Sequence, residues 1–264
     1  MALKQFNTSS LTTNGNFKLK ALVYSPSGFG KSLFASTAPN PAVLTCETGH
    51  GAGMLSAQKA GIDCFVPETY ADMELFCSGH GLEKYDTLIV DGFSYATDTI
   101  VKTHALTIPR SHGETKKREM GILELSDYGT LAELERRLLA RLLQNQKNIL
   151  VTCLQDYYSP PQGGSDPRPE KIGGPDLPGM MRLGSTALFD FVFKLDMRPA
   201  LKDPKDPKSR YNQRFWRTSA DGKYLAKTRL RDAFPEEVPF DLETGEGTFQ
   251  WFIDRAQSQK VSKS

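Results

Sequence analysis

Eight consecutive residues near the start of the chain have the types and spacing needed to hold a phosphate group. They follow an apolar run, Leu19 to Tyr24, and precede the helix-forming residues of the segment 33–35. A glycine-rich turn between a strand and a helix aims backbone N–H groups and the positive end of the helix dipole at an anion. We therefore predict a phosphate loop that binds nucleotide through Ser25, Pro26, Ser27, Gly28, Phe29, Gly30, Lys31, Ser32 and Leu33.

Two side chains of this loop carry the expected chemistry. Lys31 would reach the β- and γ-phosphates, and the hydroxyl of Ser32 would bind Mg²⁺. Ser25 stands where the usual pattern has its first glycine, whereas Gly28 and Gly30 are both present. An ordinary glycine turn is the alternative, and the strand before and helix after favour the phosphate loop.

Three further polar residues end apolar, strand-like runs, and parallel strands of an open α/β sheet bind ligands at these ends. Asp91 closes the run Thr87-Leu88-Ile89-Val90 and would be the Mg²⁺ carboxylate. Glu47 would orient water against the γ-phosphate, and Gln155 would touch that phosphate or the water. The alternatives are a helix N-cap for Asp91, a surface glutamate at Glu47 and a polar strand end at Gln155.

The elements that must position these residues alternate along the chain. Apolar runs predict strands at 18–24, 42–47, 64–67, 87–91, 148–154 and 187–195. Helical patterns occupy 72–77, 93–106, 128–143 and 249–256, and 128–143 has the clearest apolar stripe. Residues 158–184 are expected to form a long irregular segment. Asp221-Gly222 predicts a hairpin between 214–218 and 223–227. This order predicts an α/β fold with a mostly parallel sheet and helices on both faces.

Composition excludes several classes of protein. The 264 residues are 39% hydrophobic and 24% charged with a net charge of +2, so no global basic signal for nucleic acid exists. No apolar stretch approaches a membrane span, and residues 1–20 lack the apolar centre of a signal peptide. The four cysteines contain no C-x-x-C pair, and the four histidines are scattered. We expect residence in the cytoplasm, that of the host if a phage encodes the protein.

The order of these parts resembles the RecA-type ATPase core over about residues 18–235. Ala226-Lys227-Thr228-Arg229 looks like the K-x-R element of RadA- and DnaB-like members. The short spacing from Lys31 to Glu47 is most similar to compact phage-encoded RecA-like proteins, including single-strand-annealing recombination ATPases. Two departures are Ser25 and the pair Leu230-Arg231, where RadA-like proteins have Phe-Gly.

This resemblance implies a Mg²⁺-dependent ATPase with ATP as its nucleotide. It implies that Glu47 is the catalytic base, Gln155 the γ-phosphate sensor, and Lys227 and Arg229 cations that enter a neighbouring subunit's site. Residues 108–126 and 158–184 stand where the family carries DNA-binding loops. The candidate DNA contacts there are Lys116, Lys117, Arg118, Arg168, Lys171 and Arg182, although a solvated basic surface is the alternative.

We expect a flexible N-terminal arm at 1–17, a single RecA-like ATPase domain at 18–256 and a polar basic tail at 257–264. The expected partners are further copies of this chain in a ring or filament, single-stranded DNA and a single-strand-binding protein. The alternatives are an ATP-driven motor or loader, such as a helicase or packaging accessory, a P-loop phosphotransferase, and a nucleotide-dependent binding module that does not hydrolyse.

Overall fold

The computed structural model describes residues 17–47, 61–109, 122–159, 171–203, 205–206, 208–230 and 233–258. In these residues, ten strands form one sheet in the order β10-β8-β7-β1-β5-β4-β2-β3, with β6 paired to β5 and β9 paired to β7. The strands are β1 (Lys20–Ser25), β2 (Pro41–Thr45), β3 (Asp63–Phe65), β4 (Thr87–Asp91), β5 (Asn148–Tyr158), β6 (Ile172–Pro175), β7 (Phe191–Leu201), β8 (Arg210–Arg217), β9 (Lys227–Thr228) and β10 (Glu237–Pro239).

The centre of the sheet is parallel. Strands β7, β1, β5, β4, β2 and β3 are joined only by parallel pairings, and every residue of β4 is buried. A continuous apolar run such as Leu88-Ile89-Val90 suits this position because both faces of a central parallel strand are covered. The register sets Ser25 beside Leu154 and Thr45 beside Asp91, so the carboxyl ends of four strands meet at one edge.

The helices are α2 (Lys31–Ala35), α4 (Tyr70–Ser78), α5 (Phe93–Ala96), the π-helical turn η2 (Thr97–Val101), α6 (Lys102–Thr107), α7 (Asp127–Leu143), α8 (Met181–Leu188) and α9 (Phe249–Ser258). Helix α4 begins with a capping box in which Thr69 and Asp72 bind each other's backbone N–H. Within the described segments, no helix is long and apolar enough to cross a membrane.

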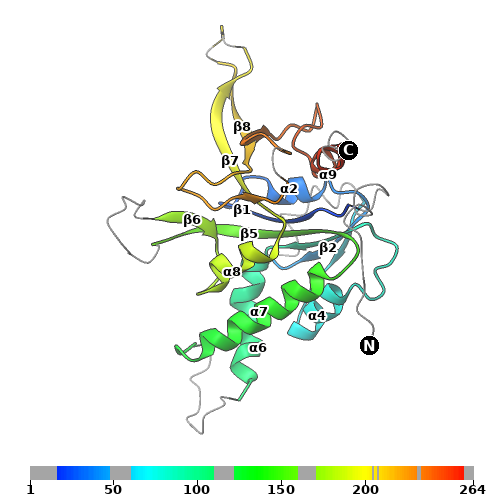
Figure 1. The fold of residues 1–264 in the computed structure, drawn as a ribbon, viewed down its shortest axis with the longest axis vertical. Coiled ribbons are helices and arrows are strands. Elements are labelled where there is room, and N and C mark those ends of the chain that lie inside the picture. The colour runs from blue at the N-terminus through cyan, green and yellow to red at the C-terminus, as the bar shows by residue number, and fades with distance from the viewer. Residues whose placement is uncertain are drawn as a thin grey trace.

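Helices cover both faces of the sheet, as the sequence predicted (Figure 1). Successive residues of a strand point to opposite faces. Leu22 and Tyr24 accordingly join the core beneath α4 and α7, whereas Ala21 and Val23 join the core beneath α2 and α9. The alternation along β1 therefore places the phosphate loop between two separate apolar cores.

Several details of the predicted elements were wrong. Residues 172–175 form β6 inside the segment 158–184 that was expected to be irregular, and α8 begins in that segment at Met181 and continues to Leu188. β7 therefore starts at Phe191 rather than at 187. Strand β5 continues past Gln155 to Tyr158. The turn at Asp221-Gly222 does not join a hairpin, because β8 pairs with β7 and β10 while β9 pairs with β7.

Trp216 is the residue through which β8 holds α2 and α9 together. Its side chain is fully buried, its ring lies 4.4 Å from the ring of Phe34 between centroids, and its indole N–H donates to the Gly247 carbonyl at 2.8 Å. We expect Trp216→Ala to lower the free energy of unfolding by about 3–5 kcal/mol, because it leaves a large cavity. Urea unfolding measures this change. The control is Trp251→Ala, at the half-buried tryptophan of α9, and a loss as small as the control's would contradict the prediction.

Candidate nucleotide site

The phosphate loop connects β1 to α2 in a conformation that requires its glycines. Gly28 and Gly30 have φ angles of 79° and 108°, in the left-handed region that side chains rarely adopt. A Cβ atom at Gly30 would also lie 3.1 Å from Nε of Arg214. Both glycines are therefore needed for the loop to curl as it does.

Lys31 is a buried cation inside this loop. Its side chain is 7% exposed, and its ammonium donates to the Ser25 carbonyl at 3.0 Å, the Ser25 hydroxyl at 3.2 Å and the Pro26 carbonyl at 3.1 Å. Burial lowers the pKa of Lys31, and the negative charges of Asp91 and Glu47 oppose that effect. In the described part of the chain no carboxylate forms an ion pair with this ammonium, so its charge suits an anionic ligand.

Ser32 and Asp91 lie together as predicted. The Ser32 hydroxyl donates to Asp91 Oδ2 at 2.8 Å, and Asp91 is 2% exposed. Thr152 on β5 donates to the other carboxylate oxygen at 2.5 Å and accepts the Gly92 N–H at 2.9 Å. The carboxylate is thus held facing the loop, and the hydroxyl and carboxylate oxygens are the ligand types that Mg²⁺ prefers.

Glu47 follows β2 and reaches the same edge. Its Cγ lies 2.8 Å from where a Cβ of Gly92 would stand, and Gly92 has a φ of 84°. Although the residue is exposed, loss of surrounding water raises the pKa of Glu47, Asp91 raises it further, and Lys31 lowers it. The structure therefore brings Lys31, Ser32, Asp91 and Glu47 into one charged cluster.

Gln155 follows Leu154, which pairs with Ser25 in the β1–β5 ladder. Its side chain nevertheless does not lie on the face of the sheet that carries Thr152. Alternation along β5 sets it on the face opposite Thr152, and a Cβ at Gly173 would stand 3.4 Å from its Nε2. Its Oε1 is buried without a hydrogen-bond partner among the described residues. The structure does not bring this amide to the Asp91 cluster, and its predicted sensor role remains a prediction.

Sequence reasoning missed three residues of the site: Thr152, Gly92 and Arg214. Arg214 on β8 donates from Nε to the Phe29 carbonyl at 2.8 Å, across a separation of 185 residues. It also lines a cavity of about 530 Å³ with Leu33 of α2 and with residues 211–213 and 239–243. A lone polar residue in the apolar run 148–154 could have drawn attention to Thr152, but no local pattern marks Arg214.

Lys227 and Arg229 both lie at the C-terminal end of α8. The Lys227 ammonium donates to the carbonyls of Thr186, Ala187 and Phe189 at 3.1, 3.4 and 2.9 Å. Arg229 is more open, with 55% of its side chain exposed, and it pairs with Asp190 at 2.7 Å. The two cations therefore do project together, but Lys227 has one carbonyl acceptor for each of its three ammonium protons.

Most of the predicted DNA contacts lie outside the described residues: Lys116, Lys117, Arg118 and Arg168. Lys171 is exposed at the start of β6. Arg182 on α8 pairs with Asp156 at 2.6 Å and is 20% exposed, so its charge is already matched within the chain.

A family model described as an AAA domain (AAA_24) matches residues 18–230. No curated protein matches the chain. Similar solved structures include a KaiC-like protein, PH0186, from the archaeon Pyrococcus horikoshii OT3, with 14% identity, a TM-score of 0.44 and 84% of each chain covered. Another is the flagellar accessory protein FlaH from Methanocaldococcus jannaschii, with 8% identity, a TM-score of 0.41, and 90% of this chain and 93% of that chain covered.

The family match spans most of the chain, including the phosphate loop, the four strand ends and the Lys227–Arg229 element. The charged cluster lies at the carboxyl edge of the parallel strands, within the matched residues. The chain therefore belongs to this AAA-domain family.

Proposed function

We propose that this protein binds and hydrolyses ATP with Mg²⁺ and uses the energy on single-stranded DNA, as a phage-encoded protein of recombination or annealing in the host cytoplasm. The observation that supports hydrolysis best is the convergence of Lys31, Ser32, Asp91 and Glu47. The action on single-stranded DNA is supported by the resemblance to compact phage-encoded RecA-like proteins.

Each residue of the cluster has a distinct task in this proposal. The loop N–H groups and Lys31 bind the phosphates, and Ser32 and Asp91 would hold Mg²⁺, which supplies positive charge where the transition state becomes more negative. Glu47 would hold the attacking water and accept its proton. Lys31 keeps its ammonium aimed across the loop through the Ser25 and Pro26 carbonyls, so little reorganisation is needed when phosphate arrives.

The cavity beside α2 suits the nucleoside part of ATP. It combines the apolar side chains of Leu33, Phe240 and Leu242 with the polar side chains of Asn212 and Gln213. A pocket that is partly apolar with a few polar groups is the usual setting for a heterocyclic ring. Arg214 joins this cavity to the phosphate loop through the Phe29 carbonyl.

The test is phosphate release from ATP with and without Mg²⁺ and with and without a poly(dT) oligonucleotide. The proposal expects Mg²⁺-dependent hydrolysis that single-stranded DNA stimulates. Hydrolysis that responds to duplex DNA and drives unwinding or translocation would favour a motor or loader. Transfer of phosphate to a small molecule would favour a phosphotransferase, and the absence of hydrolysis would contradict the proposal.

Glu47→Gln tests the assigned base. We expect ATP affinity within about twofold of the parent and turnover reduced by about 10²–10⁴-fold, because glutamine cannot accept the proton of water. Isothermal titration and phosphate release measure the two quantities. The control is Glu68→Gln, which neutralises an exposed glutamate after β3. Unchanged turnover in the Glu47 variant would move the base to another residue.

A further inference from the structure

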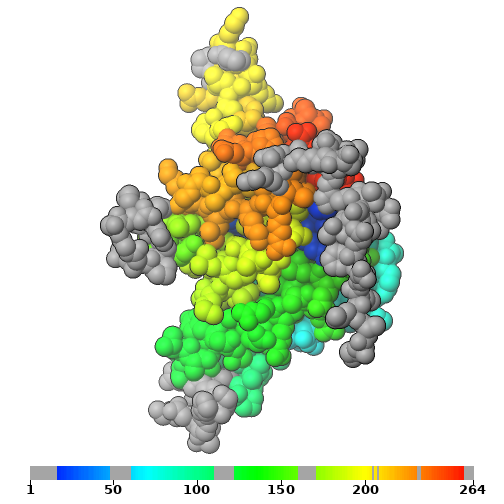
Figure 2. Space-filling model, in the orientation of Figure 1, coloured from blue at the N-terminus to red at the C-terminus, as the bar shows by residue number. Residues whose placement is uncertain are grey.

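Strands β7 and β8 continue beyond the sheet as a two-stranded projection. β7 pairs with β1 as far as Lys194, but its ladder with β8 continues to the pair of Leu201 and Arg210. β10 covers β8 only at residues 215–217. We call residues 195–214 the β7–β8 ribbon, and it stands out from the body of the molecule (Figures 1 and 2). At about 3.3 Å per residue, the seven residues 195–201 span roughly 23 Å.

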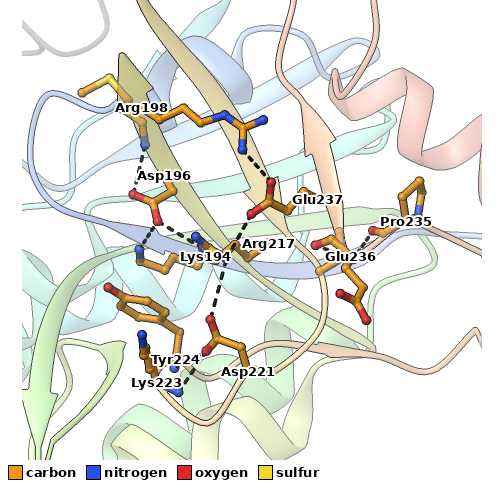
Figure 3. Close-up of polar contacts among 12 residues, drawn as sticks. Lys194, Asp196, Arg198, Arg217, Asp221, Lys223, Tyr224, Pro235, Glu236 and Glu237 are labelled. Atoms are coloured by element: carbon orange, nitrogen blue, oxygen red, sulfur yellow. Dashed lines mark hydrogen bonds and ion pairs between the residues drawn. The ribbon is translucent and has the colours of Figure 1, made fainter. Parts of the chain in front are cut away.

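The base of the ribbon is held by ion pairs that neutralise its cations (Figure 3). Asp196 accepts from Lys194 at 2.6 Å and from Arg217 at 3.2 Å. Glu237 pairs with Arg198 at 2.8 Å and with Arg217 at 3.1 Å. Because Lys194 is 2% exposed, this network is partly buried and ties the ribbon to the sheet.

The tip of the ribbon has the opposite character. Lys202, Lys205, Lys208 and Arg210 are all exposed, and within the described residues none of them forms an ion pair. The two neighbouring carboxylates are also exposed, and each accepts a backbone N–H of the turn. Asp203 Oδ1 accepts the Lys205 N–H and Asp206 Oδ1 accepts the Lys208 N–H, both at 2.9 Å. Four cations and two carboxylates thus occupy residues 202–210, on a turn that their own hydrogen bonds shape.

We propose that the tip of the β7–β8 ribbon contacts the phosphate backbone of the single strand on which this protein acts. Unpaired, exposed cations at the end of a hydrogen-bonded two-stranded projection suit phosphates, because each contact releases a condensed counterion. The inference rests on the proposed action on single-stranded DNA. It assigns that contact to a part of the chain distinct from the two loops that the sequence suggested.

The ribbon also touches the nucleotide site at its root. Arg210 at the tip and Arg214 at the phosphate loop lie on the same strand, four residues apart. With DNA bound at Arg210 and the Phe29 carbonyl bound at Arg214, strand β8 would directly connect the DNA backbone to the phosphate loop. Contact at the tip is therefore expected to change the rate of ATP hydrolysis.

The test variant is Lys205→Gln, Lys208→Gln, Arg210→Gln. It leaves Lys202 in place, because that residue also lines the cavity beside α2. The control, Arg136→Gln, Arg137→Gln, Arg141→Gln, removes three exposed cations from α7. Binding of fluorescent poly(dT) is followed by anisotropy across a salt series. We expect the tip variant to bind poly(dT) about 10- to 100-fold more weakly. The slope of its log binding constant against log salt concentration should be smaller in magnitude by about 2. Its basal ATP turnover should be unchanged, but DNA should no longer stimulate it. The control should behave as the parent.

The double variant Lys205→Gln, Lys208→Gln should lie between the parent and the triple variant, and thermal melting verifies that all variants are folded. Equal binding by the parent and the tip variant would overturn this inference and leave the proposed function standing. Equal losses in the tip and control variants would overturn it as well, because only total charge would then matter. A parent protein that hydrolyses ATP but binds no single strand would reject both this inference and the DNA part of the proposed function.

Discussion

Lys31→Ala is expected to abolish tight ATP binding and to bring hydrolysis below detection. The variant removes the one cation that lies inside the phosphate loop among the described residues, and it also removes the three hydrogen bonds that the ammonium makes across that loop. Positive charge at this point acts in a buried setting, where water screens it little. The expected loss therefore exceeds that from any exposed lysine.

Isothermal titration with Mg²⁺ and ATP, together with phosphate release, measures this effect. The matched control is Lys20→Ala at the opposite end of β1, where the half-buried ammonium binds the carbonyls of Leu143 and Asn145. That variant also loses one lysine charge, but at the end of β1 far from the phosphate loop, so we expect lower stability and preserved turnover per folded molecule. A Lys31→Ala protein that hydrolyses ATP at the parent's rate would show that the loop has another purpose.

The conformation of the loop and its place between a strand and a helix could be predicted, because both depend on local sequence. Gly28, Gly30, Lys31 and Ser32 are consecutive or nearly so, and the strand and helix around them are visible as an apolar run and a helix start. The position of Asp91 could also be predicted. A carboxylate that ends a buried parallel strand lies at the same edge of the sheet as the phosphate loop. The 2.8 Å Ser32–Asp91 hydrogen bond places this carboxylate beside the loop, and its role toward Mg²⁺ stays a prediction.

Contacts between distant segments could not be predicted in this way. Arg214 reaches the loop only because β7 and β8 lie on one side of β1. The order of strands in a sheet cannot be predicted from the sequence of any one segment. Gly173 is a second example. A Cβ there would stand 2.6 Å from the Tyr224 ring, so the glycines that suggested an irregular segment instead allow β6 to lie against that tyrosine.

At Asp221-Gly222 the local prediction of a turn was correct, whereas the predicted pairing of the strands beside it was not. The turn forms as predicted: Gly222 has a φ of 80°, and Asp221 Oδ1 accepts the N–H groups of Lys223 and Tyr224. The strands beside it nevertheless pair elsewhere, because β8 makes eight residue pairs with β7. A long ladder outweighs a local turn signal when both compete for one strand.

Arg229→Ala carries the second large expected effect, if this cation enters a neighbouring subunit's site as the sequence resemblance implies. Arg229 follows β9 and lies beside the C-terminal end of α8 with 55% of its side chain exposed, whereas Lys227 already has a carbonyl for each ammonium proton. Arg229 is therefore the cation that can turn toward a neighbouring subunit's triphosphate. Arginines that act in this way contribute on the order of 10³–10⁵-fold to turnover.

We expect Arg229→Ala to bind ATP normally and to hydrolyse it about 10³-fold more slowly. The control is Asp190→Asn, which breaks the same ion pair from the other side and keeps the guanidinium free to move. Mixing the Arg229→Ala and Lys31→Ala proteins should restore part of the activity, since some interfaces then join an intact loop to an intact arginine. Light scattering during turnover measures the assembly. A fully active monomer, together with no recovery on mixing, would reject action between subunits. Arg229 would then serve only to form the ion pair with Asp190.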